Sequence, residues 1–177
     1  MHWIKHYISE YRTDPKRKAI FSIEWHQTAS DPQDHIAYIE ITVFIRPIVT
    51  IIYDGEQWEE DVKFVCNAGS KWDVRANKNR CTFYDSIEIA NGLKSFGIGS
   101  FIFHSVLNVF IEYFPKASLC LSLSPVDELD EDNKIRRNRM YEKIELIKNK
   151  GGTKYSIEHI ENLNLKKEFN YIVEINI

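Results

Sequence analysis

Two glycines, Gly97 and Gly99, interrupt the segment Lys94 to Ser100, which lies between the strand-like run Phe83 to Ile89 and the apolar helical run Phe101 to Phe114. The first backbone N–H groups of a helix have no partner inside the helix, and the helix dipole adds partial positive charge at the same place. Glycine permits unusual φ values and lets a ligand approach the backbone closely. The segment therefore predicts a loop that binds a phosphate or pyrophosphate.

Other residue types that often carry chemistry are present in patterns that predict little. His2 and His6 have a metal-compatible spacing on one face of an expected N-terminal helix, but no third ligand stands near them, so we expect no metal site. The three cysteines are widely spaced, and we interpret them as reduced core residues of a cytoplasmic protein. His104 lies among apolar helix residues and is typical of packing. The sequence contains no nucleophilic triad and no P-loop.

Composition limits the class of protein. The chain has 177 residues, of which 44% are hydrophobic, enough for one folded domain over residues 1–177. The formal net charge of -3 argues against a dedicated nucleic-acid binder, although tRNA stays open because Arg136, Arg137 and Arg139 form a local basic cluster. We interpret that cluster first as a solvated helix face. No apolar run is long enough to span a bilayer, so no membrane association is expected.

The elements that must position the glycine loop follow from hydrophobic periodicity. The pattern predicts a short amphipathic helix over 3–11 and a polar loop over 67–80. The strands that we expect in this front half cover 19–26, 36–46, 48–53 and 62–66.

The second half alternates between strands and helices. After the strand over 83–89 and the glycine loop, the pattern predicts helices over 101–113 and 133–148, a short helix over 156–163, and strands over 118–123 and 169–177. A helix that connects two strands of one sheet implies parallel pairing and a right-handed crossover. The fold class that this pattern predicts is α/β, with helices that cross over one sheet.

Three motifs of this half are similar to those of one family. The run Lys94-Ser95-Phe96-Gly97-Ile98-Gly99 resembles the signature of the GNAT N-acetyltransferase superfamily: Gln or Arg, two residues, Gly, one residue, then Gly or Ala. Leu119 to Leu123 stands where the splayed partner strand of that family would fall, and Asn133 to Lys143 is similar to its asparagine-to-tyrosine helix. The resemblance covers roughly Phe83 to Ile147. It implies a GNAT-like α/β fold, with a mixed, largely antiparallel sheet and a central parallel strand pair flanked by helices. Lysine in the first loop position and Ile144 to Ile147 in place of a Gly-Phe pair depart from the pattern.

The resemblance implies transfer of an acetyl group from acetyl-CoA, bound as a co-substrate, to an amine. The pyrophosphate would lie on the N–H groups of the loop, and the pantetheine arm would pair with the strand edge before it. One backbone N–H of that strand would polarise the thioester carbonyl. The residues that the resemblance assigns to the cofactor are Ile87, Ile89, Lys94, Phe96, Gly97, Ile98, Gly99, Ser100 and Asn133.

Two residues would carry the chemistry. The resemblance implies that the hydroxyl of Tyr141 protonates the departing thiolate, the alternative being a tyrosine that only packs beside its helix neighbours. Glu88 is the candidate base for the amine, and Asp85 faces the other side of the same strand. The competing role of Asn133 is to cap its own helix.

A second function stays open beside the acyltransferase. The strand-rich front half and the altered segment after Tyr141 are compatible with a non-catalytic module that binds CoA or another protein on a GNAT-like fold. The acceptor amine cannot be identified from the sequence, and exposed strand edges leave a homodimer open.

Overall fold

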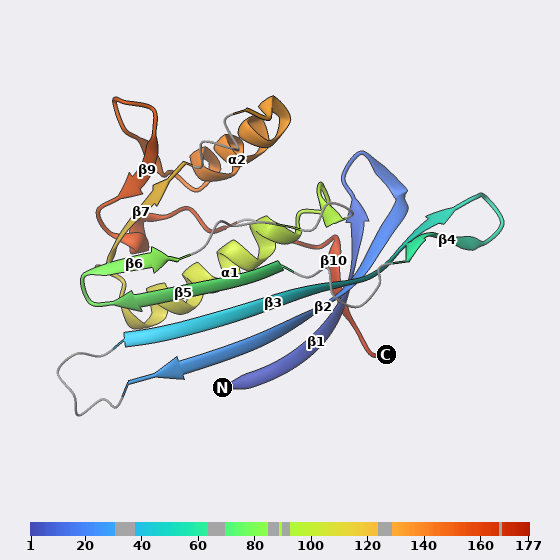
Figure 1. Cartoon of the computed structure of the whole chain (residues 1–177), viewed down its shortest axis with the longest axis horizontal. Coiled ribbons are helices and arrows are strands. Elements are labelled where there is room, and N and C mark those ends of the chain that lie inside the picture. Colours follow the sequence, from blue (N-terminus) through green and yellow to red (C-terminus); the bar gives the residue numbers. More distant parts are fainter. Residues whose placement is uncertain (31–37, 64–69, 85–88, 90–92, 124–128, 167) are drawn as a thin grey trace.

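One 10-stranded sheet organises the chain in the computed structural model (Figure 1). The structure describes residues 1–177 except 31–37, 64–69, 85–88, 90–92, 124–128 and 167. The strand order is β10-β1-β2-β3-β5-β6-β7-β9-β8, with β4 paired to β3 beside this path. Among the described residues, β6 and β7 pair in parallel and the other neighbouring strands pair antiparallel. The fold is therefore α/β with a mixed, mostly antiparallel sheet.

The elements of the front half are β1 (His2–Tyr11), β2 (Asp14–Ala29), β3 (Tyr38–Tyr53), β4 (Trp58–Lys63), β5 (Ser70–Asn77) and β6 (Arg80–Phe83). Those of the second half are α1 (Ile98–Tyr113), β7 (Ser118–Ser122), α2 (Glu131–Lys143), β8 (Ile147–Lys148), β9 (Lys154–Ile157), the 3₁₀ turn η2 (Ile160–Asn162) and β10 (Ile172–Ile175).

The N-terminal segment is a strand, so the helix expected over 3–11 is wrong. Trp3, Tyr7 and Tyr11 are four residues apart, a spacing that keeps them on one face of either a helix or a strand. Tertiary pairing decides between the two, because β1 forms backbone ladders with β2 on one side and β10 on the other. This strand conformation also places His2 and His6 roughly 13 Å apart, too far to share one metal ion.

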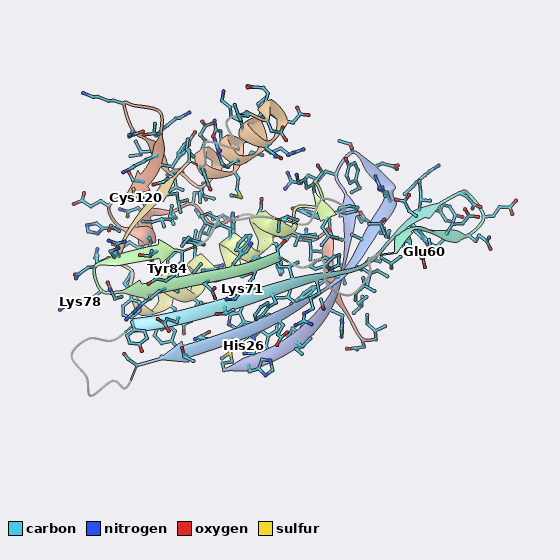
Figure 2. The ribbon with its side chains drawn as sticks, viewed as in Figure 1. His26, Glu60, Lys71, Lys78, Tyr84 and Cys120 are labelled. Carbon is cyan, nitrogen blue, oxygen red and sulfur yellow. The ribbon has the colours of Figure 1, made fainter. Side chains whose placement is uncertain are left out.

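The segment expected as a polar loop over 67–80 contains a central strand, β5. Trp72, Val74 and Ala76 are buried on one of its faces. The alternate residues, among them Asp73 and Lys71 (labelled in Figure 2), lie on the other face. The prediction failed because the residues of this strand that face away from the core are all polar, and their number hid the alternation.

The helix α1 lies along one face of the sheet (Figure 1). Its buried side chains, such as Ile102, Val106 and Phe110, pack against the apolar face of β1, β2, β3 and β5 in one continuous core. The opposite face of these strands carries charged and polar residues that pair across strands, for example Arg75 with Glu40 and Thr42 with Asp73. In the described part of the chain, the sheet face that packs against α1 is therefore apolar, and the opposite face is polar.

In the second half, α1, β7 and α2 follow β6 in the expected order. β6 shares only Phe83 with the strand expected over 83–89, of which residues 85–88 lie outside the described ones. β6 and β7, the strands before and after α1, pair in parallel, as expected of strands joined by a helix. The second helix ends at Lys143 rather than at the expected 148, and the segment 156–163 contains the end of β9 and the 3₁₀ turn. Neither helix, within the residues described, has the length and apolarity needed to cross a bilayer.

Candidate functional site

The sheet splits between β6 and β7. Their parallel pairing covers only Arg80↔Ser118 and Cys81↔Leu119 among the described residues. Beyond this point each strand keeps its outer neighbour: the N–H of Tyr84 donates to the β5 residue Asp73 (3.0 Å), and the N–H of Leu123 donates to Thr153 beside β9 (2.9 Å). The inner edges of β6 and β7 therefore separate toward their carboxyl ends, where an extended ligand could add its own amides.

The glycine loop before α1 is fixed by a buried anchor. Phe96 is 1% exposed, its ring lies edge-on to Tyr11, and its carbonyl accepts a hydrogen bond from the buried Ser9 hydroxyl (2.7 Å). Ser95 and Gly97 have positive φ values of 71° and 78°, which turn the chain into the helix. Ser9 and Tyr11 of β1 thus both contact Phe96, and these contacts fix the position of the backbone at the start of α1.

Gly97 is the N-cap of α1, and its α carbon faces the ring of Tyr171. A Cβ at this position would lie 2.7 Å from Cε2 and 2.9 Å from Cζ of that ring, closer than real contacts allow. A Cβ on Gly99 would meet Cγ1 of Ile89 at 3.2 Å. In this structure, the groups that closely approach the two glycines are therefore side chains of the protein, Tyr171 at Gly97 and Ile89 at Gly99.

The start of α1 is electrostatically suited to an anion. No side chain caps it and its first turn has no acidic residue, within the part of the chain that the structure describes. The guanidinium of Arg12 lies over the Tyr171 ring, 5.9 Å from its centroid, and donates to its hydroxyl (3.3 Å). Lys94 is partly exposed in the loop itself. Arg12, Lys94 and the helix dipole all add positive charge near the start of α1, and each therefore favours a bound anion there.

Tyr141 of α2 belongs to a row of rings beneath the split. Phe83 of β6 contacts Phe103 of α1, which contacts Tyr141, which contacts Tyr155 of β9; the successive centroids are 5.2, 5.9 and 5.2 Å apart. Tyr141 is 6% exposed. Phe103 is about 9 Å along α1 from Gly97, so the Tyr141 ring contacts α1 within two turns of the loop.

The remaining predicted site residues are not all described. Ile87 and Glu88, with Asp85, lie outside the described residues, and Ile98 is buried while Ser100 is partly exposed. The N-cap of α2 is Asp130, whose carboxylate accepts from the N–H of Asn133 (3.1 Å), so the capping role considered for Asn133 is wrong. The amide oxygen of Asn133 instead accepts from Arg136.

The cysteines differ in setting. Cys81 is buried in β6, and burial raises the pKa of its thiol to about 12, so it is not a nucleophile at neutral pH. Cys120 is exposed on β7 (Figure 2), which corrects the expectation that all three are core residues; Cys66 lies outside the described residues.

A cavity of about 340 Å³ lies between α1 and the first two strands. Aromatic rings dominate its wall, with Trp3 and Trp25 stacked at 5.5 Å, and Ser105 and Glu112 of α1 add polar atoms. Its helix residues occupy a different face of α1 from Phe103. The cavity is thus distinct from the split between β6 and β7, and sequence reasoning missed it because it took β1 for a helix.

Sequence reasoning also missed a cluster of His2, Glu24 and His26 on the polar sheet face. The alternation Glu24-x-His26 in a strand was visible, but the partner histidine becomes apparent only once the first segment is read as β1.

The chain was also compared with known proteins: no family model, no curated protein and no solved structure matches it.

Proposed function

We propose that the chain is an acyl-CoA-dependent N-acyltransferase that moves an acetyl group from acetyl-CoA to an amine, on a fold of GNAT type. The observation that carries the proposal is the separation of β6 from β7 beyond Cys81 and Leu119. Ligands of α/β proteins bind outside the carboxyl ends of strands where the sheet topology changes, beside the start of the connecting helix. β6 is such a strand, antiparallel to β5 and parallel to β7.

In this proposal the pantetheine arm adds its amides to the free inner edge of β6, as an extra strand would. The pyrophosphate lies at the start of α1, against the N–H groups of residues 96–100, where Lys94 and Arg12 add positive charge. This arrangement directs the thioester toward the split, above the row of rings that contains Tyr141.

The chemistry is direct transfer. The amine nitrogen attacks the thioester carbonyl carbon, a C–N bond forms, and the C–S bond breaks. Glu88 accepts the proton that the amine loses, and the hydroxyl of Tyr141 gives a proton to the departing thiolate. A covalent acyl-enzyme is not needed, which agrees with the raised pKa of the Cys81 thiol in β6.

Acetyl-CoA binding tests the cofactor site. Ser100→Glu places a carboxylate in the first turn of α1, where it favours the helix but repels a phosphate. Asn108→Glu adds the same charge at an exposed position two turns further along. By calorimetry we expect wild type to bind, Ser100→Glu to bind at least about tenfold more weakly, and Asn108→Glu to bind like wild type.

Circular dichroism and melting curves of the three proteins control for folding. Absence of binding to folded wild-type protein would contradict the proposal. Equal weakening by both substitutions would show that net charge, and not the start of α1, governs binding.

Tyr141→Phe tests the acid. The ring and its contacts with Phe103 and Tyr155 stay, and only the hydroxyl is lost. With an amine that wild type acetylates, measured by CoA release, we expect kcat to fall by about 10²-fold with little change in acetyl-CoA affinity. Tyr155→Phe is the matched control, since this neighbouring buried hydroxyl donates to Glu142 (2.9 Å) and has no assigned step. Equal rates for wild type and Tyr141→Phe across pH would remove the acid role.

A non-catalytic binding module is the second candidate. One observation favours it: the ring of Tyr171 and the side chain of Ile89 account for both glycines without a ligand. Acetyl-CoA binding without turnover on small amines, lysine peptides or peptide N-termini would favour a module that binds CoA.

A further inference from the structure

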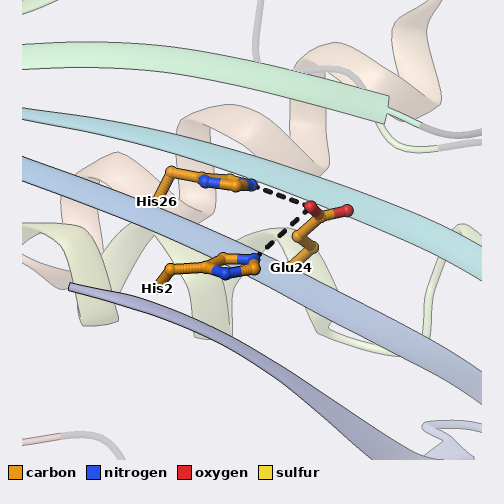
Figure 3. Close-up of side chains that lie close together, drawn as sticks. All are labelled: His2, Glu24 and His26. Carbon is orange, nitrogen blue, oxygen red and sulfur yellow. Dashed lines mark hydrogen bonds and ion pairs between the residues drawn. The ribbon is translucent and has the colours of Figure 1, made fainter.

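Three side chains with metal-ligating atoms converge on the polar face of the sheet, opposite α1 (Figure 3). Nε2 of His26 lies 2.8 Å from Oε1 of Glu24, and Nε2 of His2 lies 3.6 Å from the same oxygen. One ligand atom from each residue can be chosen so that all three are within 4.8 Å of one another. Both imidazoles direct the same nitrogen at one carboxylate oxygen.

The register of the sheet produces this arrangement. His2 of β1 is directly opposite His26 of β2, and Glu24 is two residues before His26 on the same strand face. The two imidazole rings stack, with centroids 4.2 Å apart and an interplanar angle of 15°. The cluster therefore rests on a backbone ladder that continues through Trp3↔Trp25 and further along β1.

The carboxylate is held in place from a third strand. Arg46 of β3 donates to Oε2 of Glu24 (2.8 Å), which fixes the carboxylate and leaves Oε1 directed at the histidines. The two imidazoles therefore face a carboxylate whose position is fixed by a neighbouring strand.

We propose that His2, Glu24 and His26 bind one divalent transition-metal ion of the zinc type. Two imidazole nitrogens and one carboxylate oxygen are a donor set that such ions prefer, with bonds of about 2.0–2.2 Å. Ligands at those bond lengths in a tetrahedron are roughly 3.4 Å apart. The separations of 2.8 and 3.6 Å between the carboxylate oxygen and the two nitrogens bracket that value, and the two nitrogens lie within 4.8 Å of each other.

Binding replaces the hydrogen bond between His26 and Glu24. Each imidazole must then carry its proton on Nδ1 and offer the Nε2 lone pair to the ion. His2 and His26 are 54% and 42% exposed, against 18% for Glu24, so an ion reaches the site from solvent and keeps a fourth position for water. Because β1 and β2 each contribute ligands, the ion cross-links the start of the first strand to its neighbour.

Zinc titration of tag-free protein at pH 7.5 tests the site, with ZnCl₂ as the probe in calorimetry. We expect one ion per chain, and at least about tenfold weaker binding for each of His2→Gln, Glu24→Gln and His26→Gln. His6→Gln is the matched control, since His6 lies on the same face of β1 but opposite Ser22. MgCl₂ should give no comparable binding, because Mg²⁺ prefers oxygen ligands. Zinc should also raise the melting temperature of wild type but not of the three ligand variants.

Absence of stoichiometric zinc binding to folded wild-type protein would overturn the proposal, as would a His6→Gln variant that loses as much affinity as His26→Gln. His2→Gln keeps the test decisive if the β2 variants fail to fold, because His2 is exposed at the beginning of its strand. The site is on the sheet face away from α1, so its outcome does not depend on the acyltransferase proposal.

Discussion

Gly97 combines two constraints that can be separated by mutation. Its φ of 78° is strained for any residue with a Cβ, and the Tyr171 ring occupies the space where that Cβ would be. Gly152 has a similar φ of 71°, but a Cβ there would meet only Cε of Lys148, at 3.8 Å. Gly152→Ala therefore measures the backbone strain alone, and Gly97→Ala measures strain together with displacement of the ring.

For Gly152→Ala we expect a loss of about 1 kcal/mol in the free energy of unfolding. For Gly97→Ala we expect about 2–3 kcal/mol, since the Tyr171 ring must also give up its contacts with Arg12 and Phe169. In a Tyr171→Ala background the cost of Gly97→Ala should fall to that of Gly152→Ala. Urea unfolding of the four variants and the wild type provides this double-mutant cycle. Additive costs at Gly97 and Tyr171 would show that the ring does not constrain the glycine.

Elements whose own sequence pattern determines their structure were predicted correctly. Elements whose structure depends on pairing with neighbouring strands were not. The apolar run of α1 and the alternation of β7 are decided by their own residues, and both were placed within a few positions. In β1, residues four apart share a face in either a helix or a strand, and only its neighbours β2 and β10 select the strand. β5 was taken for a loop because its outward residues are uniformly polar.

The candidate site shows the same division. The position of the glycine loop between a strand and a helix followed from sequence, because glycine placement and apolar periodicity are local signals. The contact of Tyr171 with Gly97 and the cluster of His2 with Glu24 join segments far apart in the chain. Such contacts depend on register, which a single sequence does not reveal when neighbouring strands are misassigned.

At the scale of the whole molecule, the last strand of the chain pairs beside the first at one end of the sheet. β10 pairs with β1, which places Glu174 directly opposite Tyr7, and Lys5 forms an ion pair with the same carboxylate (2.8 Å). Tyr7 also packs against Phe21 of β2 and Phe101 of α1, with centroids 5.7 and 5.6 Å away. Four elements from both ends and the middle of the chain thus set the environment of one phenol.

That environment makes stability sensitive to alkaline pH. Burial, and then the charge of Glu174, raise the pKa of Tyr7 to about 12, whereas an unfolded chain has a tyrosine pKa of about 10. Between these values the unfolded chain releases the proton and the folded chain retains it, so the free energy of unfolding falls as pH rises from 10 to 12. Below pH 10 both states are protonated, and this contribution is constant.

Over this window wild type should lose on the order of 1 kcal/mol more than Tyr7→Phe, a value reduced from the full shift because solvent screens the hydroxyl. Glu174→Gln should show an intermediate slope, since it removes the smaller cause and keeps burial. Urea unfolding at a series of pH values measures all three, and the raised thiol pKa of Cys81 cancels because each protein retains it. Parallel slopes for wild type and Tyr7→Phe would mean that β10 and α1 do not enclose the phenol, and the pairing of β10 beside β1 would then be in question.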